Sequence, residues 1–224
     1  NYEYVIARAE IGRTERRLTV SDHVQITNKE NDKAIPVLSR LENEADVSQN
    51  KTYAQSNLMK LYYNKKDYPN SGIYAEKVLM NPKADDNVKS DAQIIIARAA
   101  IETGDEAKAK VAYAKVLAIA KGELAAEALY YDAYFKNKEG KFEASNAAVQ
   151  KIAKNYSSYK YFGAKGLILM AKNFYGLKDS YQATYILENI IQNFTDYPDV
   201  VSEAKTELNA IKTEEAKTNS SITK

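Results

Sequence analysis

The chain has 224 residues, of which 45% are hydrophobic and 28% are charged, a composition typical of globular proteins and unlike that of disordered chains. Its 32 Lys and Arg residues stand against 30 Asp and Glu residues, which gives a formal net charge of +2. This small excess does not supply the concentrated basic surface that a phosphate backbone requires. We therefore expect no nucleic-acid partner.

The residue types exclude several kinds of site. The chain has no cysteine and a single histidine, His23, which excludes disulfides, thiolate zinc sites, cysteine nucleophiles and sites with two imidazoles. No apolar run approaches the roughly 18 residues of a membrane span, so we expect no direct membrane insertion of this segment. Because the chain begins with Asn1, we expect that an N-terminal region, with any signal peptide, has been removed or left out.

The first predicted element is a helix near residues 2–12, where IARAEIG resembles IARAAIETG further along the chain. The next apolar stripe at helical spacing consists of Ile35, Leu38, Leu41 and Ala45. Residues 1–46 are therefore predicted to form a divergent first helix pair with an inserted loop at about 14–29. Apolar and polar residues alternate within the insertion, which fits either an extended segment or an irregular polar loop.

Between residues 52 and 197 a helical apolar pattern breaks at a short polar turn and then resumes, four times. The turns lie near residues 66–67, 104–105, 140–141 and 178–179, and the aligned residues Asp67, Asp105, Lys141 and Asp179 are 38, 36 and 38 residues apart. A period this steady predicts three to four repeats of helix, turn and helix. One such pair leaves an apolar face uncovered, so the pairs must stack, and the predicted fold class is all-α.

Small residues recur at fixed distances before these turns. Eight residues before each aligned turn position stand Met59, Ala97, Ala133 and Ala171, and thirteen residues before stand Ala54, Ala92, Ala128 and Gly166. We expect paired helices to approach most closely at these positions.

These features resemble those of the tetratricopeptide repeat family. The match includes a GD-like turn, an aromatic residue just after the turn (Tyr68, Phe142, Tyr181) and a small residue early in the second helix (Ser71, Ala109, Ser145, Ala183). The resemblance implies a right-handed α-solenoid of antiparallel helix pairs. The periods exceed the family's usual length of about 34 residues, and the family's early tryptophan is absent.

Together with the segment IIQNFTDYPDVVSEAKTEL, the long period resembles the longer-helix variety found in proteins of the bacterial cell envelope. The resemblance thus implies a periplasmic or outer-membrane-associated location in a bacterium, while a cytoplasmic location stays open.

Residues 198–213 are predicted to form a C-terminal capping helix. Pro198 suits the first turn of a helix, and the stripe Val201, Ala204, Leu208 and Ile211 would cover the last repeat while the polar side meets water. Residues 214–224 have no periodicity and are predicted to form a mobile tail.

No motif of an enzyme is present: the chain lacks a nucleophile elbow, a phosphate loop, a GxGxxG sequence and an HExxH sequence. The neighbouring acids Asp85 and Asp86 are expected to begin a helix, because the residues after them do not supply further calcium ligands. We therefore expect no catalytic residue, no metal and no cofactor.

The register of the repeat family implies which side chains face the concave groove. These are aromatic and basic residues of successive first helices: Tyr53, Lys60, Tyr63, Arg98, Tyr130, Tyr134, Lys172 and Tyr175. In the family such a row commonly receives an extended peptide or a terminal carboxylate. The leading prediction is a non-catalytic scaffold that binds a protein or peptide in this groove. The alternative is a structural or self-associating segment of a larger envelope repeat protein, with no groove ligand. In that case the chain could form a homo-oligomer.

Overall fold

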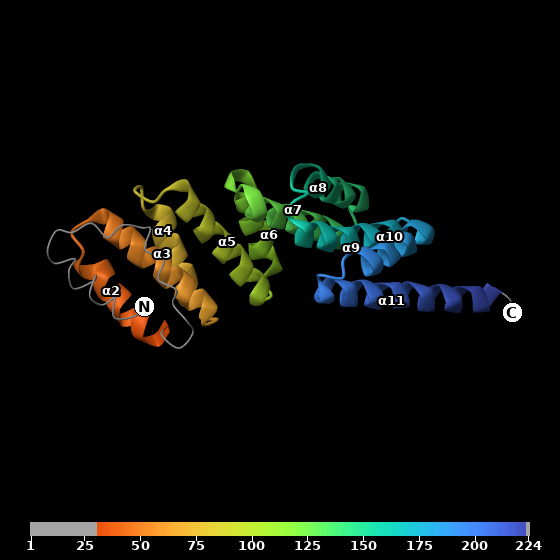
Figure 1. The fold of residues 1–224 in the computed structure, drawn as a ribbon, viewed down its shortest axis with the longest axis horizontal. Helices are drawn as coiled ribbons and strands as arrows, with labels where there is room; N and C mark the ends of the chain where they lie inside the picture. The colour runs from red at the N-terminus through yellow and green to blue at the C-terminus, as the bar shows by residue number, and fades with distance from the viewer. Residues whose placement is uncertain (1–30, 223–224) are drawn as a thin grey trace. The chain divides into compact units, whose positions relative to one another are not determined.

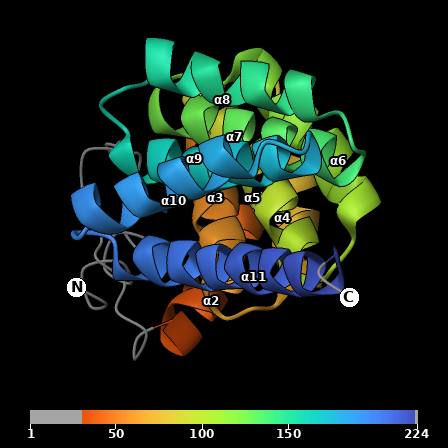
Figure 2. The same ribbon diagram turned by 90° about the vertical axis from the view of Figure 1, so that its right-hand side faces the viewer.

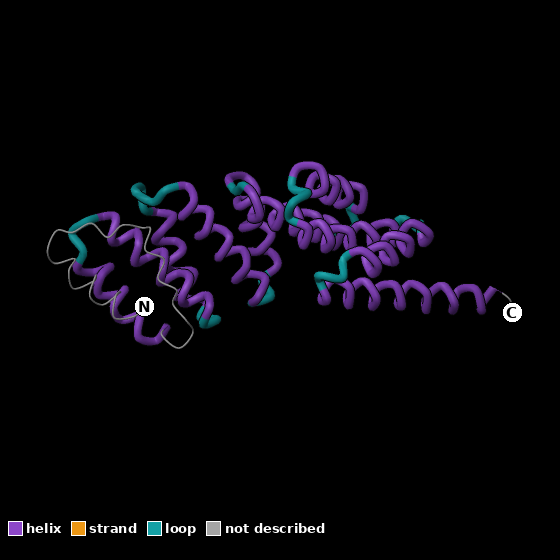
Figure 3. The backbone as a smooth tube through the Cα atoms, viewed as in Figure 1, coloured by secondary structure: helices purple, strands orange, loops and turns teal. Residues whose placement is uncertain are grey.

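The computed structural model of the protein describes residues 31–222, with side chains described from 34 to 218, and this part of the chain contains helices and no strands (Figures 1 and 3). The helices are α2 (Asn31–Glu44), α3 (Ser48–Asn64), α4 (Tyr68–Met80), α5 (Asp86–Glu102), α6 (Glu106–Ile119), α7 (Gly122–Lys138), α8 (Phe142–Asn155), α9 (Lys160–Gly176), α10 (Ser180–Asn193) and α11 (Pro198–Ile222). The predicted helix near residues 2–12 and the insertion at 14–29 lie outside the described residues.

Helices α3 to α10 form four consecutive pairs, each made of two helices that pack against each other. The first helix of every pair has 17 residues, and the first helices begin at Ser48, Asp86, Gly122 and Lys160, which are 38, 36 and 38 residues apart. The all-α fold and the period predicted from the sequence are both confirmed. Asp85 accepts a hydrogen bond from the backbone N–H of Val88 at 2.9 Å, so it begins α5 as expected.

The chain divides between Ile119 and Ala120 into two compact units, a boundary that the sequence pattern did not indicate. Within unit 1, α2 packs on α3 and α4 packs on α5. Within unit 2, α8 packs on α9 and α10 packs on α11. Each unit is thus a stack of helix pairs with its own apolar clusters, as in an all-α solenoid.

The predicted positions eight residues before the turns are buried within the pairs, whereas a Cβ added at Gly166, thirteen residues before its turn, would meet Val149 and Ile152 of α8, in the preceding pair. Met59, Ala97, Ala133 and Ala171 are fully buried, as are the small residues twelve positions later, Ser71, Ala109, Ser145 and Ala183. The contact is direct in two pairs, because the Ser71 hydroxyl donates to the backbone carbonyl of Met59 at 3.0 Å and the Ser145 hydroxyl donates to that of Ala133 at 2.8 Å. A larger residue at either position would force the two helices apart.

The turns within the pairs share one backbone conformation. A residue with positive φ ends each first helix: Lys66, Gly104, Gly140 and Lys178, with φ between 60° and 74°. The next residue donates its N–H to the carbonyl five positions earlier, as in Asp179 to Phe174 at 2.8 Å, which is the pattern of a Schellman cap. Two of the four turns hold this conformation with lysine, whose Cβ makes it unfavourable.

We expect Lys178→Gly to stabilise unit 2 by about 1 kcal/mol, because glycine adopts the left-handed conformation without the steric cost that lysine carries. Thermal or urea unfolding would measure the change. The matched control is Lys151→Gly, an exposed position within α8, where glycine should lower the free energy of unfolding by about 1 kcal/mol. A Lys178→Gly variant that unfolds as easily as the control would contradict the strain assigned to this turn.

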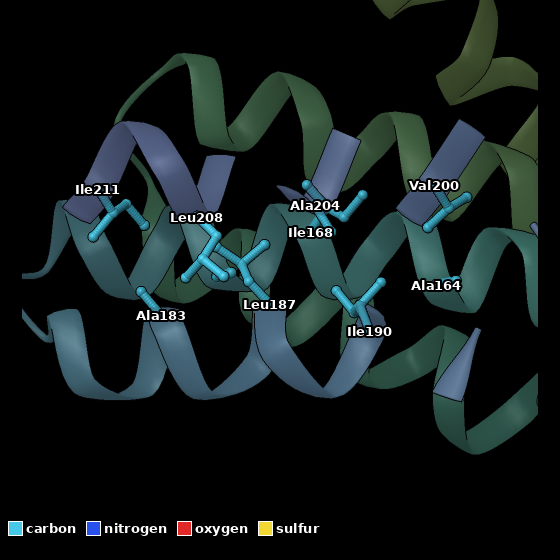
Figure 4. Packing of buried hydrophobic residues seen from close by; sticks show 10 residues of the cluster. Ala164, Ile168, Ala183, Leu187, Ile190, Val200, Ala204, Leu208 and Ile211 are labelled. Carbon is cyan, nitrogen blue, oxygen red and sulfur yellow. The ribbon is translucent and has the colours of Figure 1, made fainter. Parts of the chain in front are cut away.

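Helix α11 closes unit 2 (Figure 2). It packs on α10 and α9, and its buried stripe consists of Val200, Ala204, Leu208 and Ile211 (Figure 4). The predicted stripe began at Val201, which is wrong: residue 201 lies about 100° around the helix from residue 200, and only the latter is buried. The side of α11 away from this stripe is largely exposed, as a capping helix requires.

The same helix continues to Ile222, nine residues past the predicted end at 213. Residues 214–217, EEAK, are strong helix formers, and the Thr218 hydroxyl donates to the carbonyl of Glu214 at 3.0 Å. The absence of an apolar stripe therefore does not end this helix, and the described part of the predicted tail is helical.

Candidate functional site

The structure places the eight predicted groove residues on first helices, four in each unit. Tyr53, Lys60 and Tyr63 lie on α3 and Arg98 lies on α5 in unit 1, and in unit 2 the residues are Tyr130 and Tyr134 on α7 with Lys172 and Tyr175 on α9. The predicted row of cations, Lys60, Arg98 and Lys172, is therefore divided between the units. Each half is a candidate surface by itself.

In unit 1 the predicted residues are mostly engaged within the unit. Tyr53 and Tyr63 are half-buried against apolar clusters, and the Lys60 ammonium forms an ion pair with Asp91 of α5 at 2.6 Å. Arg98 is half-buried. Tyr53 also lines a small hollow of about 320 Å³ between the start of α3 and the start of α5, whose other walls are mainly polar.

In unit 2 the first helices α7 and α9 lie side by side, and α9 also contacts α11. A continuous series of aromatic rings crosses them, which we call the ring row: Tyr134, Tyr131, Tyr130, Phe162, Tyr161 and Tyr197. Successive ring centroids in this row are between 5.0 and 6.3 Å apart. All six residues are partly exposed, so the row contributes aromatic area to the surface of unit 2.

Acids of α11 pair with the polar residues of α9 beside the ring row. Glu203 forms an ion pair with Lys165, Glu207 forms one with Lys172 at 2.7 Å, and the Tyr161 hydroxyl donates to Asp199 at 2.9 Å. The ammonium group of Lys165 also lies 5.8 Å from the centroid of the Tyr130 ring. An anionic partner of Lys172 would therefore have to compete with a carboxylate of the same unit.

Two phenols of the ring row, Tyr130 and Tyr161, have raised pKa values. Burial, together with the hydrogen bond to Asp199, raises the pKa of Tyr161 to about 12. Burial, with a smaller contribution from Glu203, raises the pKa of Tyr130 still further. The hydrogen bond from Tyr161 in turn lowers the pKa of Asp199. At neutral pH the two phenols are thus neutral hydrogen-bond donors, and Asp199 is a carboxylate.

A buried amide network holds α7, α8 and α9 together beneath this surface. The Asn137 amide donates to the Asn173 side-chain oxygen at 2.7 Å, and the Asn173 amide donates to the Ser145 hydroxyl at 2.9 Å and to the Asn146 oxygen at 2.7 Å. Asn173 is completely buried and satisfied, so its role is structural. The network fixes the relative orientation of the helices that carry the ring row.

Reasoning from the sequence missed most of this surface. It identified Tyr130 and Tyr134 but not Tyr131, Tyr161, Phe162, Tyr197 or the acids of α11. A signal for the acids was present, because Asp199, Glu203 and Glu207 recur every four residues, and the first two stand 38 residues after Tyr161 and Lys165. One repeat length therefore separates each of these two acids from its partner.

Among the described residues, no group of three His, Cys, Asp or Glu could hold a metal ion, and no helix is long and apolar enough to span a membrane. No protein-family model matches the chain, and a search of curated proteins found no match. The likeness to tetratricopeptide repeats therefore remains a resemblance, carried by the period, the turn positions and the small residues.

Proposed function

We propose that this chain is a non-catalytic repeat scaffold and that the ring row binds an extended segment of a partner polypeptide. The observation that carries the proposal is the run of six partly exposed rings across α7 and α9, in contact from Tyr134 to Tyr197. Tyrosine is well suited to such a surface, because it buries a large area with little side-chain entropy to lose. The resemblance to envelope repeat proteins supports placing the scaffold in a bacterial periplasm or at an outer membrane.

The charges beside the ring row favour a polypeptide over a simple anion. Lys165 and Lys172 are matched by Glu203 and Glu207, so the surface offers both signs at close spacing rather than a cationic row. Rings then supply most of the affinity, and charged pairs at the edge supply orientation. Binding should consequently weaken with added salt without being abolished.

We expect Tyr134→Ala to weaken peptide binding by about 2 kcal/mol, because a packed aromatic anchor contributes more than an exposed ion. Lys172→Ala, which removes a charge beside the ring row, should cost at most about 1 kcal/mol. The peptides would be selected from a random display library on the parent protein, and their affinities measured by calorimetric titration.

The matched control is Tyr181→Ala, which removes an exposed tyrosine of unit 2 outside the ring row. Circular dichroism would establish that each variant keeps its helicity. Equal affinities for the parent and Tyr134→Ala, or an equal loss in Tyr181→Ala, would remove the ring row as the binding surface.

One observation favours the alternative, a self-associating structural segment. Tyr181 and Tyr185 of α10 are 75% and 56% exposed and stack on each other at 6.4 Å, which leaves an aromatic pair uncovered. Light scattering across a concentration series distinguishes the two functions. A dimer that dissociates in Tyr181→Ala would support self-association, whereas a monomer with an open ring row would support polypeptide binding.

A further inference from the structure

Unit 2 contains a hollow, which we call the α8–α10 hollow and which shares Tyr197 with the ring row. Its volume is about 620 Å³. Its walls come from α8, α9, the end of α10, the loop between α8 and α9 and the loop between α10 and α11. The floor is apolar, with Val149 and Ile152 of α8 and Leu167 and Met170 of α9. This size lies in the usual range of small-molecule sites, about 300–1,000 Å³.

Aromatic rings form the two ends of the hollow. Tyr156 and Tyr159 lie in the loop between α8 and α9, with ring centroids 6.5 Å apart, and Phe194 and Tyr197 lie in the loop between α10 and α11. The hollow is therefore bounded by loops at its ends as well as by helices along its floor.

Polar groups without partners surround the apolar floor. None of the described residues forms a hydrogen bond with the hydroxyls of Tyr156, Tyr159 or Tyr197, and within the same part of the chain neither Lys160 nor Asp196 is in an ion pair. The lining thus contains three phenols, one cation and one anion. Because the two charges balance, the lining favours neither an anion nor a cation, and neutral or zwitterionic ligands suit it best.

We infer that the α8–α10 hollow is a binding site for a small neutral or zwitterionic molecule with a ring-bearing apolar body and a hydrogen-bonding head group. The apolar floor and the rings of Tyr156, Tyr159 and Phe194 contact the body of the ligand. The hydroxyls of Tyr156 and Tyr197, with Lys160 and Asp196, meet its polar end, whereas the Tyr159 hydroxyl lies beside Gly122 at the start of α7. A site with a few convergent polar groups around an apolar body is the usual arrangement of small-molecule pockets.

Gly163 offers a way to fill the hollow without disturbing its walls. It lies on α9 and lines the hollow, and a Cβ added there has nothing within 4 Å. Gly163→Leu therefore occupies the space that the ligand needs and removes a glycine from a helix. Gly72 of α4 in unit 1 is equally open, so Gly72→Leu is the matched control.

The experiment titrates the full chain with N-phenyl-1-naphthylamine, a neutral amine that carries a phenyl and a naphthyl group and whose fluorescence rises in apolar surroundings. We expect saturable binding at one site on the parent, affinity reduced about tenfold or more in Gly163→Leu, and little change in Gly72→Leu. A second variant, Ala153→Phe, fills the hollow from the exposed side of α8 and should reduce affinity to a similar extent. Circular dichroism checks that each variant is folded.

Four results would overturn the inference. The first is a dye signal that does not saturate on the parent, and the second is an equal dye affinity in the parent, Gly163→Leu and Ala153→Phe. The third is a loss of dye affinity in Gly72→Leu as large as in Gly163→Leu. The fourth is a dye affinity that falls as the protein concentration rises, because a second copy then covers the hollow. Because Tyr197 belongs to both surfaces, the variant that separates the two proposals is Tyr134→Ala, which should weaken peptide binding on the ring row and leave dye binding in the hollow unchanged.

Discussion

Deleting the chain from Pro198 onward should unfold or aggregate unit 2. The deletion removes α11 and with it Val200, Leu208 and Ile211, and it exposes the side chains that they cover, which include Ile168, Leu187 and Ile190 (Figure 4). Each large apolar side chain taken out of its buried position costs roughly 1.5–3 kcal/mol. The combined loss for six such side chains is comparable to the whole free energy of unfolding of a typical domain, which is roughly 5–15 kcal/mol.

The matching control is a deletion from Thr218, which removes only residues that lie past the buried stripe. Thermal melting and light scattering of the two truncated proteins would measure the difference. If both truncated proteins had the melting temperature and the light scattering of the parent, the capping role of α11 would be wrong.

Enlarging the small residue midway along a first helix should destabilise the pair that contains it. Ala97, Ala133 and Ala171 are completely buried, and the backbone of the second helix approaches closely enough for Ser145 to reach the carbonyl of Ala133. Leucine at any of these positions cannot fit without moving a helix, so we expect a loss of about 1–3 kcal/mol for each variant.

The control for this series is Ala144→Leu, because Ala144 is an exposed alanine on α8. Urea unfolding would give the free energy of each variant. Three leucine variants with midpoints equal to that of Ala144→Leu would mean that these alanines are not at the helix contacts.

The sequence was sufficient for the parts of the fold that repeat. Ala97, Ala133 and Ala171 recur because every pair meets the same packing constraint, and a constraint that acts four times leaves a period that can be counted. The left-handed turn residues were harder to identify, since Lys66 and Lys178 occupy a conformation that the residue type does not indicate.

The candidate site was less predictable because a contact between two helices depends on how each helix is rotated, even where one repeat length separates the two partners. Lys172 had the expected position on a first helix, but its ion pair with Glu207 depends on how α11 rotates against α9, and the predicted stripe started one residue too late at Val201. Tyr131 lies between two predicted residues, Tyr130 and Tyr134, and contacts both rings only because of the side-chain directions on α7. The division between Ile119 and Ala120 also left no mark in the sequence, since the period continues across it.

The alternation of serine and alanine at the start of the second helices has a mechanical consequence. A hydrogen bond is directional, so turning α4 or α8 about its own axis breaks the bond from Ser71 or Ser145 to the facing carbonyl. The contacts of Ala109 and Ala183 have no such preference. Under a twisting load, we therefore expect the hydrogen bonds of Ser71 and Ser145 to resist rotation of α4 and α8, a restraint that α6 and α10 lack.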